Sequence, residues 1–149
     1  MTLSLFMQTA LEEARHAADR GEVPVGAVVV HNNQIIARDG NRVEERNDPT
    51  AHAELLVLAE ARARLGKMRL PDCDLYVTLE PCTMCAGAIS LSRVRRLYYG
   101  AQDPKGGAVE NGVRFFNQAT CHHAPDVYSE IAAQECEALL KRFFQTLRD

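Results

Sequence analysis

Two short motifs, thirty positions apart, constrain this 149-residue chain more than any other feature. His52-Ala53-Glu54 opens one expected helix, and Pro81-Cys82-Thr83-Met84-Cys85 opens another. Because Cys82 and Cys85 are three positions apart, their sulfur atoms lie on one side of a first helical turn. A helix N-terminus stabilises negative charge and so favours thiolate over thiol. Two thiolates and one imidazole make a three-ligand site for a tetrahedral metal ion.

The metal that suits these ligands is zinc, one ion per chain, with its fourth position open as in catalytic sites. Zinc lowers the pKa of a bound water to about 7. Glu54 follows His52 by two positions, and such positions do not face one another in mid-helix. Both residues therefore address one site only if they straddle a helix start, which the start signals at 48–50 permit. A carboxylate there can take the proton of the water, so we predict Glu54 as the catalytic residue.

Two other interpretations of the cysteine pair remain open at this point. A Cys-x-x-Cys pair that follows a strand can be a redox pair. A structural zinc site needs a fourth ligand, which Cys73, Cys121, His122 or His123 could supply. The combination of H-x-E with P-C-x-x-C, each opening a helix, is the signature of zinc deaminases and favours the catalytic interpretation.

Hydropathy patterning predicts a single α/β domain over residues 1–149. We expect helices over residues 3–20 and 52–65, from just after Pro81 to about Ser92, and from about Ser129 onward. We expect strands over 25–30, 34–38, 74–79 and 94–99, with Asn32-Asn33 as a hairpin turn. Residues 39–50 and the segment around Gly106, Gly107 and Gly112 are expected to be loops. This order implies a mixed central sheet with a hairpin at one edge.

Composition excludes several classes of protein. With 46 % hydrophobic and 25 % charged residues, the chain is neither disordered nor fibrous. The sequence has no apolar run of about 18 residues, so we expect no membrane span. The N-terminus begins an amphipathic pattern instead of a signal-peptide core, so we expect a cytoplasmic protein. An odd count of 5 cysteines does not suit a disulfide framework.

Charge is unevenly distributed along the chain, although the net charge is only −3. Residues 1–60 carry 5 basic and 10 acidic groups, whereas residues 61–149 carry 12 and 10. Five cations could form a basic patch for nucleic acid: Arg93, Arg95, Arg96, Lys105 and Arg114. The alternative is an ordinary solvated face.

The remaining aromatic and cysteine residues suggest structural roles. Phe115-Phe116 and Phe143-Phe144 are expected to pack in the core, with stacking on nucleic-acid bases as the alternative. Cys73, Cys121 and Cys136 are expected to be small buried hydrophobic residues.

Over nearly its whole length the chain resembles the bacterial tRNA adenosine deaminases of the cytidine deaminase superfamily, which convert the wobble adenosine of an anticodon to inosine. The matching stretches are EVPVGAVVVHNN from Glu22, DPTAHAE from Asp48, LYVTLEPCTMCAGAI from Leu75 and GAxDxKxGA from Gly100 to Ala108. The zinc motif is shared with other deaminases, whereas the element with Asp103 and Lys105 is more typical of the tRNA branch. The alternative function is deamination of a free base or nucleoside, of the guanine, cytosine or cytidine type, with the same zinc chemistry.

This resemblance implies a three-layer α/β/α sandwich around a five-stranded mixed sheet, a homodimer, and a tRNA anticodon stem-loop as partner. It implies that His52, Cys82 and Cys85 bind zinc and that Glu54 is the proton shuttle. It also implies substrate contacts for Val25, Asn41 and Ala53 at the nucleoside pocket, and for Asp103, Lys105, His122 and His123 at the anticodon loop. The chain departs from the family pattern over residues 109–121.

Overall fold

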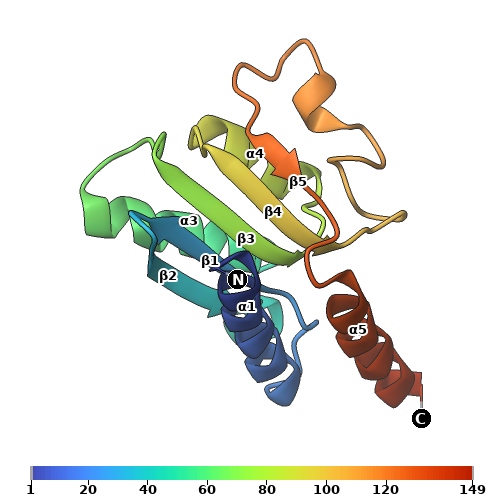
Figure 1. Ribbon diagram of the computed structural model, residues 1–149. Coiled ribbons are helices and arrows are strands. Elements are labelled where there is room, and N and C mark those ends of the chain that lie inside the picture. The colour runs from blue at the N-terminus through green and yellow to red at the C-terminus, as the bar shows by residue number, and fades with distance from the viewer. Residues whose placement is uncertain (1, 149) are drawn as a thin grey trace.

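The computed structural model describes residues 2–148, so Met1 and Asp149 lie outside the described chain. Helices cover both faces of a five-stranded sheet, which confirms the predicted three-layer α/β/α sandwich (Figure 1). In chain order the elements are α1 (Thr2–Asp19), β1 (Gly26–His31), β2 (Gln34–Gly40), α2 (Val43–Arg46), α3 (Ala53–Leu65), β3 (Cys73–Leu79), α4 (Thr83–Leu91), β4 (Arg96–Ala101), the 3-10 turn η1 (Phe115–Asn117), β5 (Asp126–Tyr128) and α5 (Ala133–Arg148).

The sheet is mixed, with the strand order β2-β1-β3-β4-β5. Strand β1 pairs antiparallel with β2 and with β3, whereas β3, β4 and β5 run parallel. Asn32 and Asn33 join the edge hairpin with φ values of 51° and 61°, which a two-residue turn of this hand requires. The predicted mixed sheet and its edge hairpin are both confirmed.

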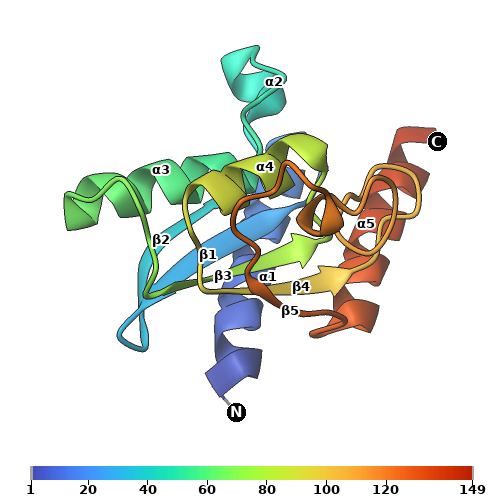
Figure 2. The same cartoon turned by 90° about the horizontal axis from the view of Figure 1, so that it is seen from above.

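The two helical layers divide the sheet residues between two apolar clusters. Val28 and Val30 of β1 pack with α1, and Ala27 and Val29 pack with α3 on the opposite face (Figure 2). A central strand buried on both faces is apolar at successive positions, which explains the continuous run from Val25 to Val30. Helix α1 crosses β1 so closely that a Cβ on Gly26 would lie 2.0 Å from the carbonyl oxygen of Ala10.

Tertiary contacts stabilise two short elements that patterning did not predict, one of them within the loop expected over 39–50. Helix α2 lies within 39–50, and the carboxylate of Glu22 accepts hydrogen bonds from the backbone N–H groups of Glu44 (3.0 Å) and Glu45 (2.8 Å) at its start. Strand β5 has only three residues and becomes a strand because it pairs with β4, with Arg96 opposite Asp126. Neither element has a periodic sequence pattern, so patterning alone misses both.

The bounds of two predicted elements, β4 and α5, differ from those in the structure. Strand β4 begins and ends two residues later than predicted, since Ala101 still pairs with Leu79 of β3. Helix α5 begins at Ala133 and not near Ser129. Glu130 and Ala132 adopt positive φ values of 62° and 57°, which an α-helix does not accommodate.

The aromatic pairs only partly follow the expected core packing. Phe116 packs against the cluster beneath α3 and α4, whereas Phe143 is half-buried and Phe144 is 42 % exposed. The core prediction is therefore wrong for Phe144. Of the three other cysteines, Cys73 and Cys136 are buried and Cys121 is half-buried. None of the helices within residues 2–148 combines the length and apolar character that crossing a membrane requires.

Candidate metal centre and substrate pocket

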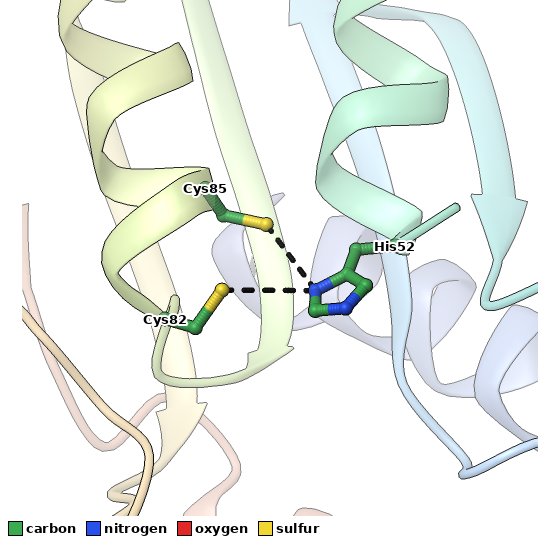
Figure 3. A group of neighbouring side chains, drawn as sticks. All are labelled: His52, Cys82 and Cys85. Atoms are coloured by element: carbon green, nitrogen blue, oxygen red, sulfur yellow. Dashed lines mark hydrogen bonds between the residues drawn. The ribbon is translucent and has the colours of Figure 1, made fainter. Parts of the chain in front are cut away.

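The three predicted ligands converge where α3 and α4 begin (Figure 3). His52 is the N-cap of α3 with an extended backbone (φ −79°, ψ 147°), so Glu54 already lies in the first turn. Cys82 is the N-cap of α4 (φ −74°, ψ 177°), and Cys85 lies in the first turn of that helix. Both helix starts therefore direct ligands, and the positive ends of their dipoles, at one point.

The geometry of the three ligand atoms fits zinc. His52 Nδ1 lies 3.7 Å from Cys82 Sγ and 3.5 Å from Cys85 Sγ. A tetrahedral zinc ion with ordinary bond lengths places its nitrogen and sulfur ligands about 3.6 Å apart. The ring nitrogen that faces the thiols is Nδ1, which the sequence could not specify. Within residues 2–148 no fourth His, Cys, Asp or Glu joins this group, so the structural-zinc interpretation lacks its fourth ligand.

The protonation of the two thiols prepares the site for a cation. A hydrogen bond from the Cys85 thiol lowers the pKa of Cys82 to about 4, so Cys82 is a thiolate at neutral pH. The same hydrogen bond, together with burial, raises the pKa of Cys85. The hydrogen bond to Cys82 raises the pKa of His52. A divalent cation would displace the remaining protons, as is usual when thiols and imidazoles bind metal.

Glu54 lies beside this ligand group and is almost completely buried, with 4 % of its surface exposed. Its carboxyl is close enough to the Cys85 thiol for each group to shift the pKa of the other. Burial raises the pKa of the Glu54 carboxyl to about 7. A carboxyl with a pKa near neutrality can both take and return a proton, which is what a general acid–base residue must do.

A cavity of about 570 Å³ opens over the metal ligands. Six of the predicted site residues line it: Val25, Asn41, His52, Glu54, Cys82 and Asp103. Phe143 and Leu147 of α5 also line it, which gives the C-terminal helix a place at the pocket that the sequence did not suggest. A cavity of this volume, lined by apolar side chains together with several polar and acidic ones, is of the size that small-molecule sites have.

Asn41 and Ala53 are linked directly at the pocket wall. The Asn41 side-chain oxygen accepts a hydrogen bond of 2.9 Å from the backbone N–H of Ala53, the residue between His52 and Glu54. Ala53 itself is fully buried. Asn41 therefore holds the start of α3 in place in addition to lining the cavity.

The other predicted RNA contacts are not all gathered around the cavity. Lys105 is exposed on the loop that carries Asp103, next to the cavity but not among its lining residues. His122 is exposed, and the His123 ring donates a 2.8 Å hydrogen bond to the carbonyl oxygen of Val94. Val94 follows the C-terminal end of α4, about 13 Å along that helix from the ligands. Contact of these two histidines with RNA remains a prediction that this geometry does not favour.

The five cations suggested as a basic patch are also dispersed. Arg95 and Arg96 pair with Asp74 at the start of β3, at distances of 3.0 and 3.7 Å. Lys105 lies beyond the opposite end of β4. These five residues therefore do not form one continuous patch, because the length of a strand separates Lys105 from Arg95 and Arg96.

Sequence patterning did not predict two residues of the pocket, the buried glutamates Glu22 and Glu80. Both line the cavity and accept hydrogen bonds from backbone N–H groups, Glu22 from the first turn of α2 and Glu80 from the loop that carries Asp103. A buried glutamate needs partners, and here they are backbone amides at least 22 residues away along the chain, which the local sequence does not reveal.

Comparison with known proteins agrees with this site. The family model of the MafB19-like deaminases matches residues 2–148. The tRNA-specific adenosine deaminase of Agrobacterium fabrum is 64 % identical over 143 residues, which cover 96 % of this chain and 94 % of that protein. This chain is a member of the tRNA-specific adenosine deaminase family. The enzyme of the same name from Bacillus subtilis is 46 % identical, over 97 % of this deaminase and 89 % of its own length.

Solved structures support the same assignment. A structure from a study of A-to-I editing by tRNA:A34 deaminases at the wobble position matches this deaminase with a TM-score of 0.90 and 65 % identity, over 91 % of this chain and 99 % of that chain. A guanine deaminase from Nitrosomonas europaea matches with a TM-score of 0.76 and 26 % identity, over 94 % of this chain and 83 % of that chain. The fold is thus common to base and tRNA deaminases.

Proposed function

We propose that this deaminase converts adenosine to inosine at the wobble position of a tRNA anticodon, by zinc-dependent hydrolysis that releases ammonia. The observation that carries the chemistry is a buried carboxyl, Glu54, beside three convergent ligands on the wall of one cavity. High identity to tRNA-specific adenosine deaminases supports the substrate. Since the substrate is tRNA, we propose the cytoplasm as the location of the enzyme.

Glu54 performs the proton transfers of the reaction. Zinc, held by His52, Cys82 and Cys85, supplies Lewis acidity that lowers the pKa of a water to about 7. The Glu54 carboxylate takes the proton that the attacking water loses and delivers it to N1 of the adenine ring. The oxygen of the water ends on C6. The same carboxylate then takes the remaining proton from the C6 hydroxyl and delivers it to the amino group. The C6–N bond breaks, ammonia leaves, and the C6 oxygen becomes the carbonyl of inosine.

The cavity wall holds the base that undergoes this reaction. Val25, Asn41 and Ala53 are proposed for the nucleoside, and Asp103 and Lys105 for the nucleotides beside it. The target adenosine must leave its stack to enter, and unpaired loop bases do so at the lowest free-energy cost. An anticodon loop therefore suits a pocket that opens at the rim formed by these residues.

The substrate is tested by incubating the purified enzyme with unmodified tRNA transcripts and sequencing the product. We expect inosine at the wobble adenosine and at no other adenosine. In parallel, ammonia release is measured with free guanine, cytosine and cytidine. Ammonia from one of these without inosine in any tRNA would contradict the proposal and favour the free-base function.

We also propose a homodimer that forms through the outer face of α4. The helix has the sequence TMCAGAISL, with no charged residue. Met84 and Leu91 are 36 % and 78 % exposed, and Gly87 and Ala88 between them are half-buried. An uncharged stripe at helical spacing on the surface is typical of a protein interface.

Sedimentation velocity at micromolar concentration tests the dimer. We expect a dimer for the wild type and a monomer for Leu91→Glu, because the substitution buries a charge in the interface. A monomeric wild type, or a Leu91→Glu variant that still dimerises, would exclude this face as the interface.

A further inference from the structure

The carboxylate of Glu80 is the centre of a hydrogen-bond cluster at the rim of the cavity. Its Oε1 accepts hydrogen bonds from the backbone N–H of Asp103 (2.9 Å) and from Asn111 Nδ2 (2.7 Å). Its Oε2 accepts hydrogen bonds from the backbone N–H groups of Val109 (3.1 Å), Glu110 (2.9 Å) and Asn111 (3.0 Å). Only 2 % of the surface of Glu80 is exposed, so these five donors replace the water that would otherwise solvate its carboxylate.

The charge of Glu80 is essential to this cluster, because every partner is a donor. A carboxamide of the same shape would direct two N–H donors of its own at other donors. Four of the five partners are backbone amides, so the cluster does not depend on the loop side chains except that of Asn111. It can therefore form although the chain departs from the family pattern from residue 109 onward.

The loop packs against Glu80 so closely that only glycine fits opposite the carboxyl group. A Cβ on Gly107 would lie 2.5 Å from Glu80 Cδ and 2.6 Å from the carbonyl oxygen of Asp103. Substitution of Gly107 thus disturbs the same contact from the loop side.

Glu80 also joins the loop to the metal ligands. It immediately precedes Pro81 and Cys82, and the backbone N–H of Ala108 donates a 2.9 Å hydrogen bond to the Pro81 carbonyl oxygen. The loop between these anchor points contributes Asp103 and Gly106 to the cavity wall. One buried carboxylate therefore fixes the rim of the pocket relative to the turn that holds Cys82.

We propose that Glu80 is a positioning residue that preforms the 103–111 loop as the wall on which the RNA substrate rests. The proposal rests on the proposed function for its substrate. Without Glu80 the loop becomes ordered only when RNA binds. The free-energy cost of ordering it then weakens RNA binding. Glu80 is not part of the ligand group, and we expect its substitution to leave the zinc ligands and Glu54 in place.

Steady-state kinetics on an anticodon stem-loop test this role with Glu80→Gln and Gly107→Ala. For both variants we expect one zinc per chain, a KM raised about tenfold or more, and a kcat within about threefold of wild type. The matched control is Asp74→Asn, which neutralises a buried carboxylate at the opposite end of β3, where it pairs with Arg95 and Arg96. We expect the control to lose thermal stability and to keep the wild-type KM.

Hydrogen exchange measured by mass spectrometry provides a readout that does not depend on activity. We expect faster exchange of the amides of residues 103–111 in Glu80→Gln and no change there in Asp74→Asn. A folded, zinc-loaded Glu80→Gln variant with wild-type KM, or with wild-type exchange in this loop, would overturn the proposal. If the wild type edits no RNA, the proposed function fails separately, and exchange alone decides whether Glu80 anchors the loop.

Discussion

His52 and Glu54 line one cavity because α3 begins between them. In the middle of a helix, side chains two positions apart diverge by about 200°, so a ligand and its neighbouring acid could not share a metal ion. The extended backbone of His52 removes this conflict. The same device places Cys82 before α4 and Cys85 within it.

Substitution of Glu54 separates metal binding from proton transfer. We expect Glu54→Gln to retain about one zinc per chain and to lose at least about 10²-fold in kcat, the lower end of the contribution of a positioned acid–base group. Metal analysis and single-turnover editing of a tRNA transcript measure the two properties. A variant with wild-type turnover would show that the proton takes another route.

Among single residues, those marked by a short sequence motif were predicted, and those whose partners lie far along the chain were not. The ligand set followed from residue type and spacing near two helix starts. Glu80 did not, because four of its donors are backbone amides at least 23 residues away, and a backbone amide leaves no trace in the sequence. The role of Asn41 as a partner of Ala53, 12 residues away, was missed for the same reason.

The contact between Glu80 and the 103–111 loop leads to a prediction about how stability depends on pH. Hydrogen bonds from Asp103, Asn111 and Glu110 hold the pKa of Glu80 below its usual value of 4.5, despite burial. A carboxyl whose pKa is lowered on folding stabilises the fold above its unfolded pKa, and this contribution is lost as pH falls through the folded pKa.

The free energy of unfolding of wild type and Glu80→Gln should therefore differ most near neutral pH. The difference should shrink as the pH falls below about 4.5, because a protonated Glu80 no longer differs from glutamine in charge. Denaturant unfolding between pH 3 and 7 measures both curves. A difference that stays constant over this range would contradict the assignment of an ionised carboxylate to this cluster.

Elements with strong periodicity were predicted well, and short elements were not. The apolar runs of β1 and β3 and the amphipathic pattern of α1 locate these elements to within about two residues. Helix α2 and strand β5 exist because Glu22 and β4, respectively, supply hydrogen-bond partners. The late start of α5 depends on two positive φ values that residues other than glycine seldom adopt.

For the molecule as a whole, net charge is a poor guide to the partner. The chain carries a net charge of −3, yet its proposed substrate is a polyanion. The sequence suggested one basic patch, but the fold places Arg95 and Arg96 at one end of β4, where they pair with Asp74, and Lys105 beyond the other end. Sequence patterning could not foresee this division, because it depends on the path of the chain after β4.

Salt dependence of RNA binding tests which cations contact phosphate. Affinity for an anticodon stem-loop should fall as salt rises, and Lys105→Ala should reduce the slope of log K against log salt by about 1. Lys67→Ala is the matched control, since Lys67 is also exposed but follows the C-terminal end of α3, away from the ligands. Equal slopes for Lys105→Ala and wild type would remove Lys105 from the interface.

The proposed deamination requires a zinc ion with three protein ligands and one position left for solvent. X-ray absorption spectroscopy at the zinc edge of the purified deaminase measures this directly. We predict two sulfur ligands, one imidazole nitrogen and one oxygen, with zinc–sulfur distances of about 2.3 Å. A first shell of four protein ligands, with a second imidazole or a third sulfur in place of the oxygen, would contradict a catalytic site.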